Sequence, residues 1–358
     1  MVTISLCMIV KNEESVLARC LDSVKDLVDE VIVADTGSSD RTREIAAAYG
    51  QVYDFPWCDD FSAARNFSFS KASMDYCMWL DADDVIAPGD HEKFRSMKKT
   101  LDPSVDVVML PYQTVFDEAG KPTFTYFRER LLKNGRGFQW QGAVHECIAP
   151  CGHIEYGEAA VQHRKQGAGD PNRNLRLYEK QLRDGKSLDA RGLFYYAREL
   201  LTHKRYADAE QVFSAFLARP DGWLENRIEA CRQLAECRLA LGKTENALQA
   251  LLSSFAIDIP RAETCCALGA LLMGQEQYRQ AAFWYETALR SPRNTRTGGF
   301  ILEDCYGYLP CIQLCVCYDR LGDYETAEAM NERAAGFRPD SAAVAYNRAY
   351  FADRKVRV

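Results

Sequence analysis

Residues 76–84 read YCMWLDADD and decide the fold of the first half of the chain. The apolar and aromatic run at 76–80 predicts a buried strand, and the carboxylates that follow lie where that strand ends. Asp81 and Asp83 are two positions apart on an extended chain, so their side chains point to the same side. Oxygen ligands of this kind suit Mg²⁺ or Mn²⁺ rather than zinc. The alternative interpretation is an acidic loop that caps the following segment.

Short apolar runs alternate with helical stretches on both sides of this segment, up to about residue 158. This pattern predicts an α/β domain, with a mostly parallel sheet covered by helices. Ser62 is the predicted N-cap of one of these helices. We expect strands at residues 4–10, 31–34, 52–55, 76–80, 105–115, 124–131 and 144–148, and helices at 15–27, 41–49 and 62–70.

The second half of the chain, after about residue 172, has helical patterns and a recurring set of small, aromatic and proline residues. The pattern resembles the tetratricopeptide repeat, a helix-turn-helix unit of about 34 residues. We therefore expect the α/β domain at residues 1–170 and an all-α repeat domain at residues 171–358, with residues 293–303 as a loop on one face. One copy contains Tyr206, Ala209, Phe213, Leu217 and Pro220, another contains Tyr278, Ala281, Tyr285, Leu289 and Pro292, and weaker copies begin near Gly242 and Tyr324.

Composition narrows the class of protein. The 358 residues are 47% hydrophobic and 27% charged, which is typical of a folded globular chain and unlike disordered or membrane-embedded proteins. A formal net charge of -7 argues against a nucleic-acid partner, because such proteins need a strongly basic face. The apolar stretch at residues 2–10 has no basic region before it, so we expect a first strand rather than a signal peptide or a membrane span.

The 14 cysteines are scattered through apolar segments. A long chain without a secretory leader disfavours a disulfide framework, and the lack of paired Cys-x-x-Cys motifs disfavours zinc. We therefore expect buried free thiols and a cytoplasmic location.

Three polar segments follow predicted strands, at residues 11–14, 35–38 and 81–84. Ligands of open α/β sheets bind beyond the carboxyl ends of the strands, so these segments are expected to share one crevice. Asp35 can accept a hydrogen bond from a uracil N–H or a ribose hydroxyl, whereas the nearby Asp40 equally suits a helix cap. Arg65 can hold a phosphate through its planar fork, or it can lie on a helix surface.

Four ordered segments resemble the family 2 glycosyltransferases with the nucleotide-sugar-binding GT-A fold, over about residues 4–167. They are SLCMIVKNEE at 5–14, VIVADTGSSDRT at 31–42, FSAARN at 61–66 and WLDADD at 79–84. The resemblance implies a nucleotide-sugar donor, with a UDP-sugar expected, and Mg²⁺ or Mn²⁺ held by Asp81, Asp83 and His163. His163 can instead be a partly buried histidine that closes the domain. The implied donor-binding residues are Val10, Asn12, Glu14, Asp35, Gly37, Arg65, Asp81, Ala82, Arg130 and Trp140.

Residues 140–146 read WQGAVHE and are expected to serve the acceptor. The Trp140 indole can pack on a sugar face, and a carboxylate or an imidazole can take the acceptor's proton. We predict Glu146 as the catalytic base, with Asp84 and His145 as alternatives. Neighbouring strand residues point to opposite faces, so His145 and Glu146 do not serve one site if this segment is extended. Family 2 bases are usually aspartates, and a glutamate departs from that pattern.

The expected function is transfer of a sugar from a nucleotide donor, with inversion at the anomeric carbon and help from a metal. The architecture resembles enzymes that glycosylate cysteine or serine of bacteriocin peptides, and helical repeats suit extended peptides, so we expect a peptide or protein acceptor. A transferase that builds cell-surface polysaccharide or lipid-linked glycans is the alternative. The intact acidic triplet disfavours a non-catalytic scaffold for protein interaction, and the lack of glycine at residues 11–14 disfavours a nucleotidyltransferase.

An apolar face near the C-terminus predicts either a homodimer interface or a helix that folds back to cap the repeats. The face consists of Phe337, Val344, Tyr346, Tyr350 and Phe351.

Overall fold

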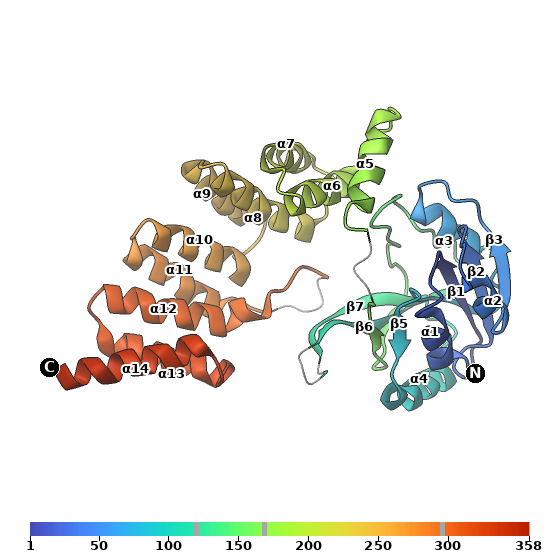
Figure 1. Ribbon diagram of the computed structural model, residues 1–358, viewed down its shortest axis with the longest axis horizontal. Coiled ribbons are helices and arrows are strands. Elements are labelled where there is room, and N and C mark those ends of the chain that lie inside the picture. Colours follow the sequence, from blue (N-terminus) through green and yellow to red (C-terminus); the bar gives the residue numbers. More distant parts are fainter. Residues whose placement is uncertain (117–119, 121, 167–169, 294–297, 358) are drawn as a thin grey trace. The chain divides into compact units, whose positions relative to one another are not determined.

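The computed structural model describes residues 1–116, 120, 122–166, 170–293 and 298–357, and it consists of two compact units, Met1–Ser187 and Leu188–Val358 (Figure 1). A sheet with helices forms the first unit, and the described residues of the second unit form helices without strands. The predicted order, an α/β domain followed by an all-α domain, is therefore confirmed.

The division between the units lies after helix α5 (Arg173–Arg183), whereas the sequence predicted a boundary at residue 170. Contacts of α5 with the first unit explain the difference. The Tyr178 hydroxyl donates a hydrogen bond to the carbonyl of Val144 at 3.3 Å, and Lys180 forms an ion pair with Asp59. The periodic pattern of an amphipathic helix shows which of its faces is buried, but it does not show which unit covers that face.

A nine-stranded sheet organises the first unit, in the order β3-β2-β1-β4-β7-β6-β9-β5, with β8 paired to β6. The first four strands are parallel to their neighbours, and β7 joins them through an antiparallel pair with β4. The strands are β1 (Ile4–Val10), β2 (Glu30–Asp35), β3 (Gln51–Asp54), β4 (Tyr76–Trp79), β5 (Asp84–Ile86), β6 (Val107–Phe116), β7 (Pro122–Lys133), β8 (Ile154–Tyr156) and β9 (Val161–His163).

Helices cover both faces of this sheet, and the alternation within β1 divides its side chains between two cores. Ile4, Leu6, Met8 and Val10 pack in one core with residues of α1 and α4, whereas Cys7 packs in another core near the end of α3. This is the period of two that the sequence of β1 predicted. The helices are α1 (Leu17–Val24), α2 (Thr42–Ala47), α3 (Phe61–Phe69) and α4 (Pro88–Thr100).

Two predictions about local structure are wrong. Residues 144–148 do not form a strand, because the chain turns between Gln141 and Cys147, whose backbones pair, and His145 has a positive φ of 52°. The N-cap of α3 is Asp60 rather than Ser62, since the Asp60 carboxylate accepts a hydrogen bond from the Ala63 N–H at 3.0 Å. Ser62 lies inside the helix and donates its hydroxyl to the same carboxylate at 2.7 Å.

Successive helix pairs build the second unit: α6–α7, α8–α9, α10–α11 and α12–α13. Tyr206, Tyr278 and Tyr324 each begin the second helix of a pair, and the alanine three positions later is fully buried in each. Small residues at this place let the paired helices approach, as the sequence predicted. The elements are α6 (Ala190–Thr202), α7 (Tyr206–Leu217), α8 (Leu224–Ala240), α9 (Thr244–Ser253), η1 (Ser254–Ala256), α10 (Ala262–Gly274), α11 (Tyr278–Arg290), η2 (Glu303–Tyr306), α12 (Tyr308–Arg320), α13 (Tyr324–Phe337) and α14 (Ala342–Arg357).

The last helix, α14, covers the end of the array. Val344 and Phe351 are buried in its contacts with the preceding helices, whereas Tyr346 is 73% exposed. The apolar side of α14 therefore packs on the repeats as a capping helix would, and a homodimer stays a prediction. All 14 cysteines are described and free, and none of the helices within the described ranges has both the length and the apolar content needed to cross a membrane.

Candidate active site

The carboxyl ends of β1, β2 and β4 meet at one edge of the sheet. The register pairs Val10 with Asp35 and Cys7 with Trp79, so the segments that follow the three strands start close together. This is the edge at which open α/β sheets bind ligands.

The loops after β1 and β2 hold each other through Asn12 and Glu14. Asn12, with a positive φ of 56°, accepts a hydrogen bond from the Ser39 N–H at 2.8 Å, and Glu14 accepts one from the Arg41 N–H at 3.0 Å. Both residues thus shape the candidate donor site by ordering its loops.

Asp35 at the end of β2 is 2% exposed and already accepts several hydrogen bonds. Its donors are the Gly37 N–H, the N–H and hydroxyl of Ser38, and Arg43 at 3.2 Å. Gly37 has a φ of 102°, a conformation that favours glycine. Val10, in contact with the same edge, is buried as well. Asp35 therefore organises the turn at residues 35–38 in addition to any role toward a nucleotide.

Arg65 of α3 is buried between two carboxylates and two indoles. Its Nη2 lies 2.6 Å from Asp81 and its Nε lies 2.6 Å from Glu146, while its guanidinium carbon lies 5.0 Å and 4.8 Å from the ring centres of Trp79 and Trp140. The structure thus brings together three predicted donor-site residues and the predicted base. It also shows that Trp140 packs on a guanidinium instead of presenting an open face.

Charge and burial act against each other in this bridge. Burial raises the pKa of Asp81, but Arg65, Arg130 and Arg128 together lower it, so the net direction is downward. Burial likewise opposes the charge on Arg65, and the two carboxylates outweigh that effect and raise its pKa. Within the described ranges, the buried Arg65 Nη1 and Trp140 Nε1 have no hydrogen-bond partner, so the hydrogen-bonding capacity of both donors is unmet.

Asp84 is enclosed by its neighbours. It is fully buried, forms an ion pair with the equally buried Arg130 at 3.1 Å, and accepts a hydrogen bond from the Tyr112 hydroxyl at 2.9 Å. An acceptor cannot reach this carboxylate, which removes Asp84 as an alternative base. Arg130 donates hydrogen bonds to Asp84 and to the carbonyl of Trp79, and a role for it toward a nucleotide stays a prediction.

Asp83, Asp84 and His163 form the candidate metal centre. One ligand atom of each lies within 4.8 Å of the others, because β5 pairs with β9 in a register that sets Asp84 opposite His163. Asp83 and Asp84 each lie 3.3 Å from His163 Nδ1, and their hydrogen bonds raise the pKa of His163 to about 10. Two carboxylates and an imidazole suit a divalent cation. Asp81, the third predicted ligand, is turned toward Arg65 instead, and Ala82 between them is buried.

Glu146 and His145 face different neighbours. Glu146 is 12% exposed and paired with Arg65, whereas the His145 ring lies nearly parallel to that of Tyr178, with their centres 6.4 Å apart. Because residues 141–147 form a turn and not an extended strand, the alternation argument for separating the two side chains does not apply here.

Sequence reasoning gave no role to two residues that support this site. Tyr112 of β6 bonds to Asp84, and Arg128 of β7 lies 4.8 Å from the ring centre of Trp79. Both come from strands far along the chain, and no motif in the sequence links them to the segment at residues 79–84.

Comparison with known proteins agrees with the fold. The model of Glycosyl transferase family 2 matches residues 5–154, and that of the Tetratricopeptide repeat matches residues 262–295. The first unit therefore contains a family 2 glycosyltransferase domain, and the second contains tetratricopeptide repeats. The fused architecture predicted from the sequence is confirmed.

Three curated relatives share parts of the chain. A TPR repeat-containing protein of Synechococcus elongatus is 39% identical over 41% of this chain and 36% of its own length. The prophage-derived glycosyltransferase SunS of Bacillus subtilis is 30% identical over 55% of this chain and 49% of its own length. The lipopolysaccharide core biosynthesis glycosyltransferase LpsC of Rhizobium meliloti is 26% identical over 42% of this chain and 58% of its own length. The chain thus spans less than two thirds of each relative.

Proposed function

We propose that the protein is a metal-dependent, inverting glycosyltransferase that moves a sugar from a UDP-sugar to a side chain of a peptide or protein. The observation that carries the proposal is the family 2 domain whose acidic residues Asp35, Asp81 and Asp83 gather at the carboxyl edge of the sheet. The free cysteines agree with a reducing compartment, and the proposal places the reaction in the cytoplasm.

The metal fits the chemistry of Asp83, Asp84 and His163, which would hold Mg²⁺ or Mn²⁺. When bound, such a cation offsets the negative charge of a departing diphosphate. His163 would lose its proton to serve as a ligand. Asp84 already bonds to Arg130 and Tyr112, so Asp83 and His163 are the ligands with more freedom to turn.

Donor binding is assigned to the loops that Asn12, Glu14 and Asp35 order. Gly37 leaves open space where a Cβ would stand, so a nucleotide base or ribose can approach the backbone there. Arg65 Nη1 and Trp140 Nε1 supply two free donors for hydroxyl or phosphate oxygens. Arg65 thus serves the donor while it holds Asp81 in place.

The acceptor's proton is assigned to Glu146. Inversion by a single displacement needs one base on the acceptor side, and Glu146 lies in the predicted acceptor segment with part of its side chain exposed. Its carboxylate bonds to Arg65, so Glu146 must keep an oxygen turned to the acceptor while the guanidinium holds the other. His145 is the alternative base.

The acceptor class rests on the repeats, because stacked helix pairs offer surfaces for extended peptides. The similarity to a lipopolysaccharide core biosynthesis glycosyltransferase favours a second candidate, transfer to a cell-surface glycan. Screening donor turnover with peptides and with lipid-linked glycans separates the two acceptor classes.

Titration calorimetry with UDP, UDP-glucose and GDP-mannose tests the proposal. We expect UDP to bind in the presence of Mn²⁺, to bind at least about tenfold more weakly with a chelator, and to lose detectable binding in Asp83→Ala. Asp26→Ala, at an exposed aspartate of the same unit, is the matched control and should bind as the wild type does. Lack of binding by all three nucleotides under every condition would contradict the proposal.

A further inference from the structure

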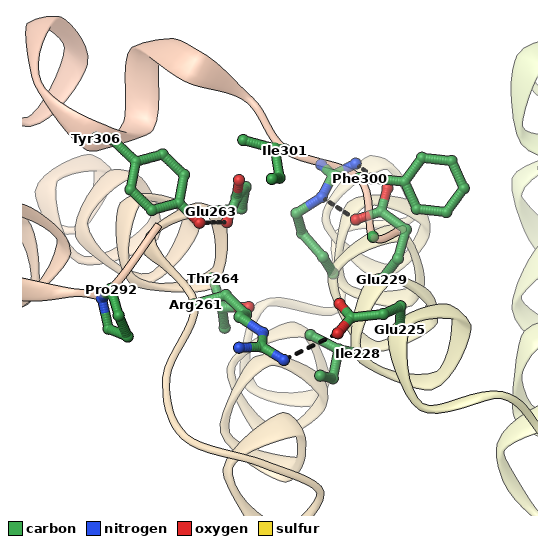
Figure 2. Close-up of a pocket in the computed structure, with 12 residues that line it drawn as sticks. Glu225, Ile228, Glu229, Arg261, Glu263, Thr264, Pro292, Phe300, Ile301 and Tyr306 are labelled. Atoms are coloured by element: carbon green, nitrogen blue, oxygen red, sulfur yellow. Dashed lines mark hydrogen bonds and ion pairs between the residues drawn. The ribbon is translucent and has the colours of Figure 1, made fainter. Parts of the chain in front are cut away.

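Arginine side chains of this protein differ in whether a carboxylate already holds them. In a pocket of the repeat unit, Arg261 forms an ion pair with Glu225 at 3.0 Å (Figure 2). Arg232 of the same pocket forms another with Glu229 at 2.6 Å. A guanidinium held in this way must leave its partner before it can bind an anion. By contrast, no carboxylate in the described part of the chain forms an ion pair with Arg173, the first residue of α5.

The position of Arg173 is locally unfavourable. The N-terminus of a helix carries a partial positive charge, which opposes a cation in the first turn. Arg176, almost one turn further along α5, forms an ion pair with Asp170. The Arg173 side chain has instead a long hydrogen bond, of 3.5 Å, to Asn174 Oδ1 and a contact with the Phe61 ring. Helix formation therefore does not explain an arginine at this place.

Arg173 contacts the face of α3 that also carries Arg65. Its guanidinium carbon lies 4.8 Å from the centre of the Phe61 ring. Phe61 and Arg65 are four positions apart in α3, so their side chains are neighbours on one face of the helix. Arg65 holds Asp81 and Glu146, and its buried Nη1 has no hydrogen-bond partner among the described residues. Two guanidinium groups therefore border one face of α3, and each has hydrogen-bonding capacity left.

The electrostatics of Glu13, in the loop after β1, indicate that Arg173 lies near the acidic edge of the sheet. Burial raises the pKa of Glu13, and the charges of Asp83 and Asp81 raise it further. The charge of Arg173 lowers it. Coulomb interactions weaken with distance, so Arg173 is close enough to act on this edge. An anionic ligand that enters here meets like charge, and a nearby cation offsets that repulsion.

A phosphate can replace the Phe61 ring as the partner of Arg173. The planar fork of a guanidinium matches two phosphate oxygens at once. Such charge-assisted hydrogen bonds are stronger than a cation–π contact at an exposed site. Arg173 is exposed, so its side chain can turn from Phe61 toward a ligand with little loss of packing.

We propose that Arg173 binds the diphosphate of the nucleotide donor and so makes α5 part of the donor site. The family 2 model matches residues 5–154, so Arg173 is a specificity-determining residue outside the matched part of the domain. Together with Nη1 of Arg65, it favours a nucleoside diphosphate over the nucleoside alone. The inference rests on the proposed function, because it needs a nucleotide donor at this edge of the sheet.

Titration calorimetry on the full chain with Mn²⁺ tests this assignment, with UDP and uridine as the probes. Uridine is measured by its displacement of UDP. In Arg173→Ala we expect UDP to bind about tenfold more weakly than to the wild type, because a bidentate contact with phosphate is lost. Uridine, which has no phosphate, should bind both proteins equally. Arg173→Lys keeps the charge without the fork and should lie between the two.

Arg176→Ala is the matched control, since Arg176 is an exposed arginine of the same helix whose partner is Asp170. It should bind UDP as the wild type does. The inference is overturned if Arg173→Ala binds UDP as tightly as the wild type, or if it loses affinity for uridine in the same proportion. Lack of UDP binding by the wild type would overturn the proposed function as well, so the two failures are distinct.

Discussion

At the scale of single residues, Arg65 connects parts of the candidate site that are distant in sequence. It comes from α3 and holds Asp81 after β4 and Glu146 in the turn at residues 141–147. A guanidinium holds its donors in a rigid planar fork, so Arg65 can fix two carboxylates in a defined geometry, whereas the rotatable point charge of a lysine would hold them less rigidly. Arg65 therefore fixes the distance between the predicted donor side and the predicted acceptor side.

Arg65→Ala should lower the free energy of unfolding by about 3–5 kcal/mol, because it leaves two carboxylates beside buried indoles without their cation. Arg65→Lys should fall between this variant and the wild type. Urea unfolding measures the effect, with Arg41→Ala as control, since Arg41 forms an exposed pair with Glu44. A loss in Arg65→Ala no larger than that of the control would mean that the bridge does not stabilise the fold.

Asp83 and Asp84 are adjacent, yet their substitutions should have different effects. Asp84→Ala leaves the fully buried Arg130 unpaired and should cost about 3–5 kcal/mol of stability in urea unfolding. Asp83 is 22% exposed in its side chain, so Asp83→Ala should unfold close to the wild type while it loses metal-dependent UDP binding. Equal stabilities of the two variants would contradict the division of roles.

At the scale of elements, the start of α3 positions Arg65. The helix begins after Asp60, whose carboxylate receives the Ala63 N–H and the Ser62 hydroxyl. Serine and aspartate are both good caps, so composition alone did not distinguish them. The extended backbone of Asp60, with φ of -143° and ψ of 108°, decides which residue is the cap.

Asp60→Ala should therefore lower the free energy of unfolding by about 1 kcal/mol, the usual cost of a lost N-cap. Ser62→Ala should cost less, because its hydroxyl only donates to the capping carboxylate. Urea unfolding of both variants under the same conditions compares them. A larger loss of unfolding free energy in Ser62→Ala than in Asp60→Ala would mean that Ser62 is the N-cap, as the sequence predicted.

At the scale of the whole molecule, the fold classes of both halves followed from sequence periodicity. The alternation within β1 and the apolar run of β4 correspond to strands, and the spacing from Tyr206 to Pro220 corresponds to a repeat helix. Long periodic segments carry this information because burial on one face repeats along the element. The packing of α5 on the first unit did not follow from its sequence, because tertiary contacts decide which unit covers the apolar face of a helix.

The candidate site was predictable in location but not in the pairing of its side chains. The positions of the predicted strand ends placed Asp35, Asp81 and Asp83 at one edge of the sheet. Periodicity could not predict that Asp81 forms an ion pair with Arg65, or that Arg130 forms one with Asp84. Both pairs join elements that are far apart in sequence. The positive φ of His145 could not be predicted either, because no sequence pattern marks which non-glycine residue adopts this conformation.

The separate cores of the two units predict how a ligand of the active site should stabilise the whole chain. Calorimetric unfolding should resolve two transitions. Arg65→Ala should lower the midpoint temperature of one of them, which identifies it as the transition of the first unit. A ligand that binds only the folded state at about 100 times its Kd adds about 2.7 kcal/mol, so UDP with Mn²⁺ should raise this transition and leave the other in place. A chelator, or Asp83→Ala, should abolish the shift. A shift confined to the transition that Arg65→Ala leaves unchanged would assign nucleotide binding to the repeats and contradict a donor site at the edge of the sheet.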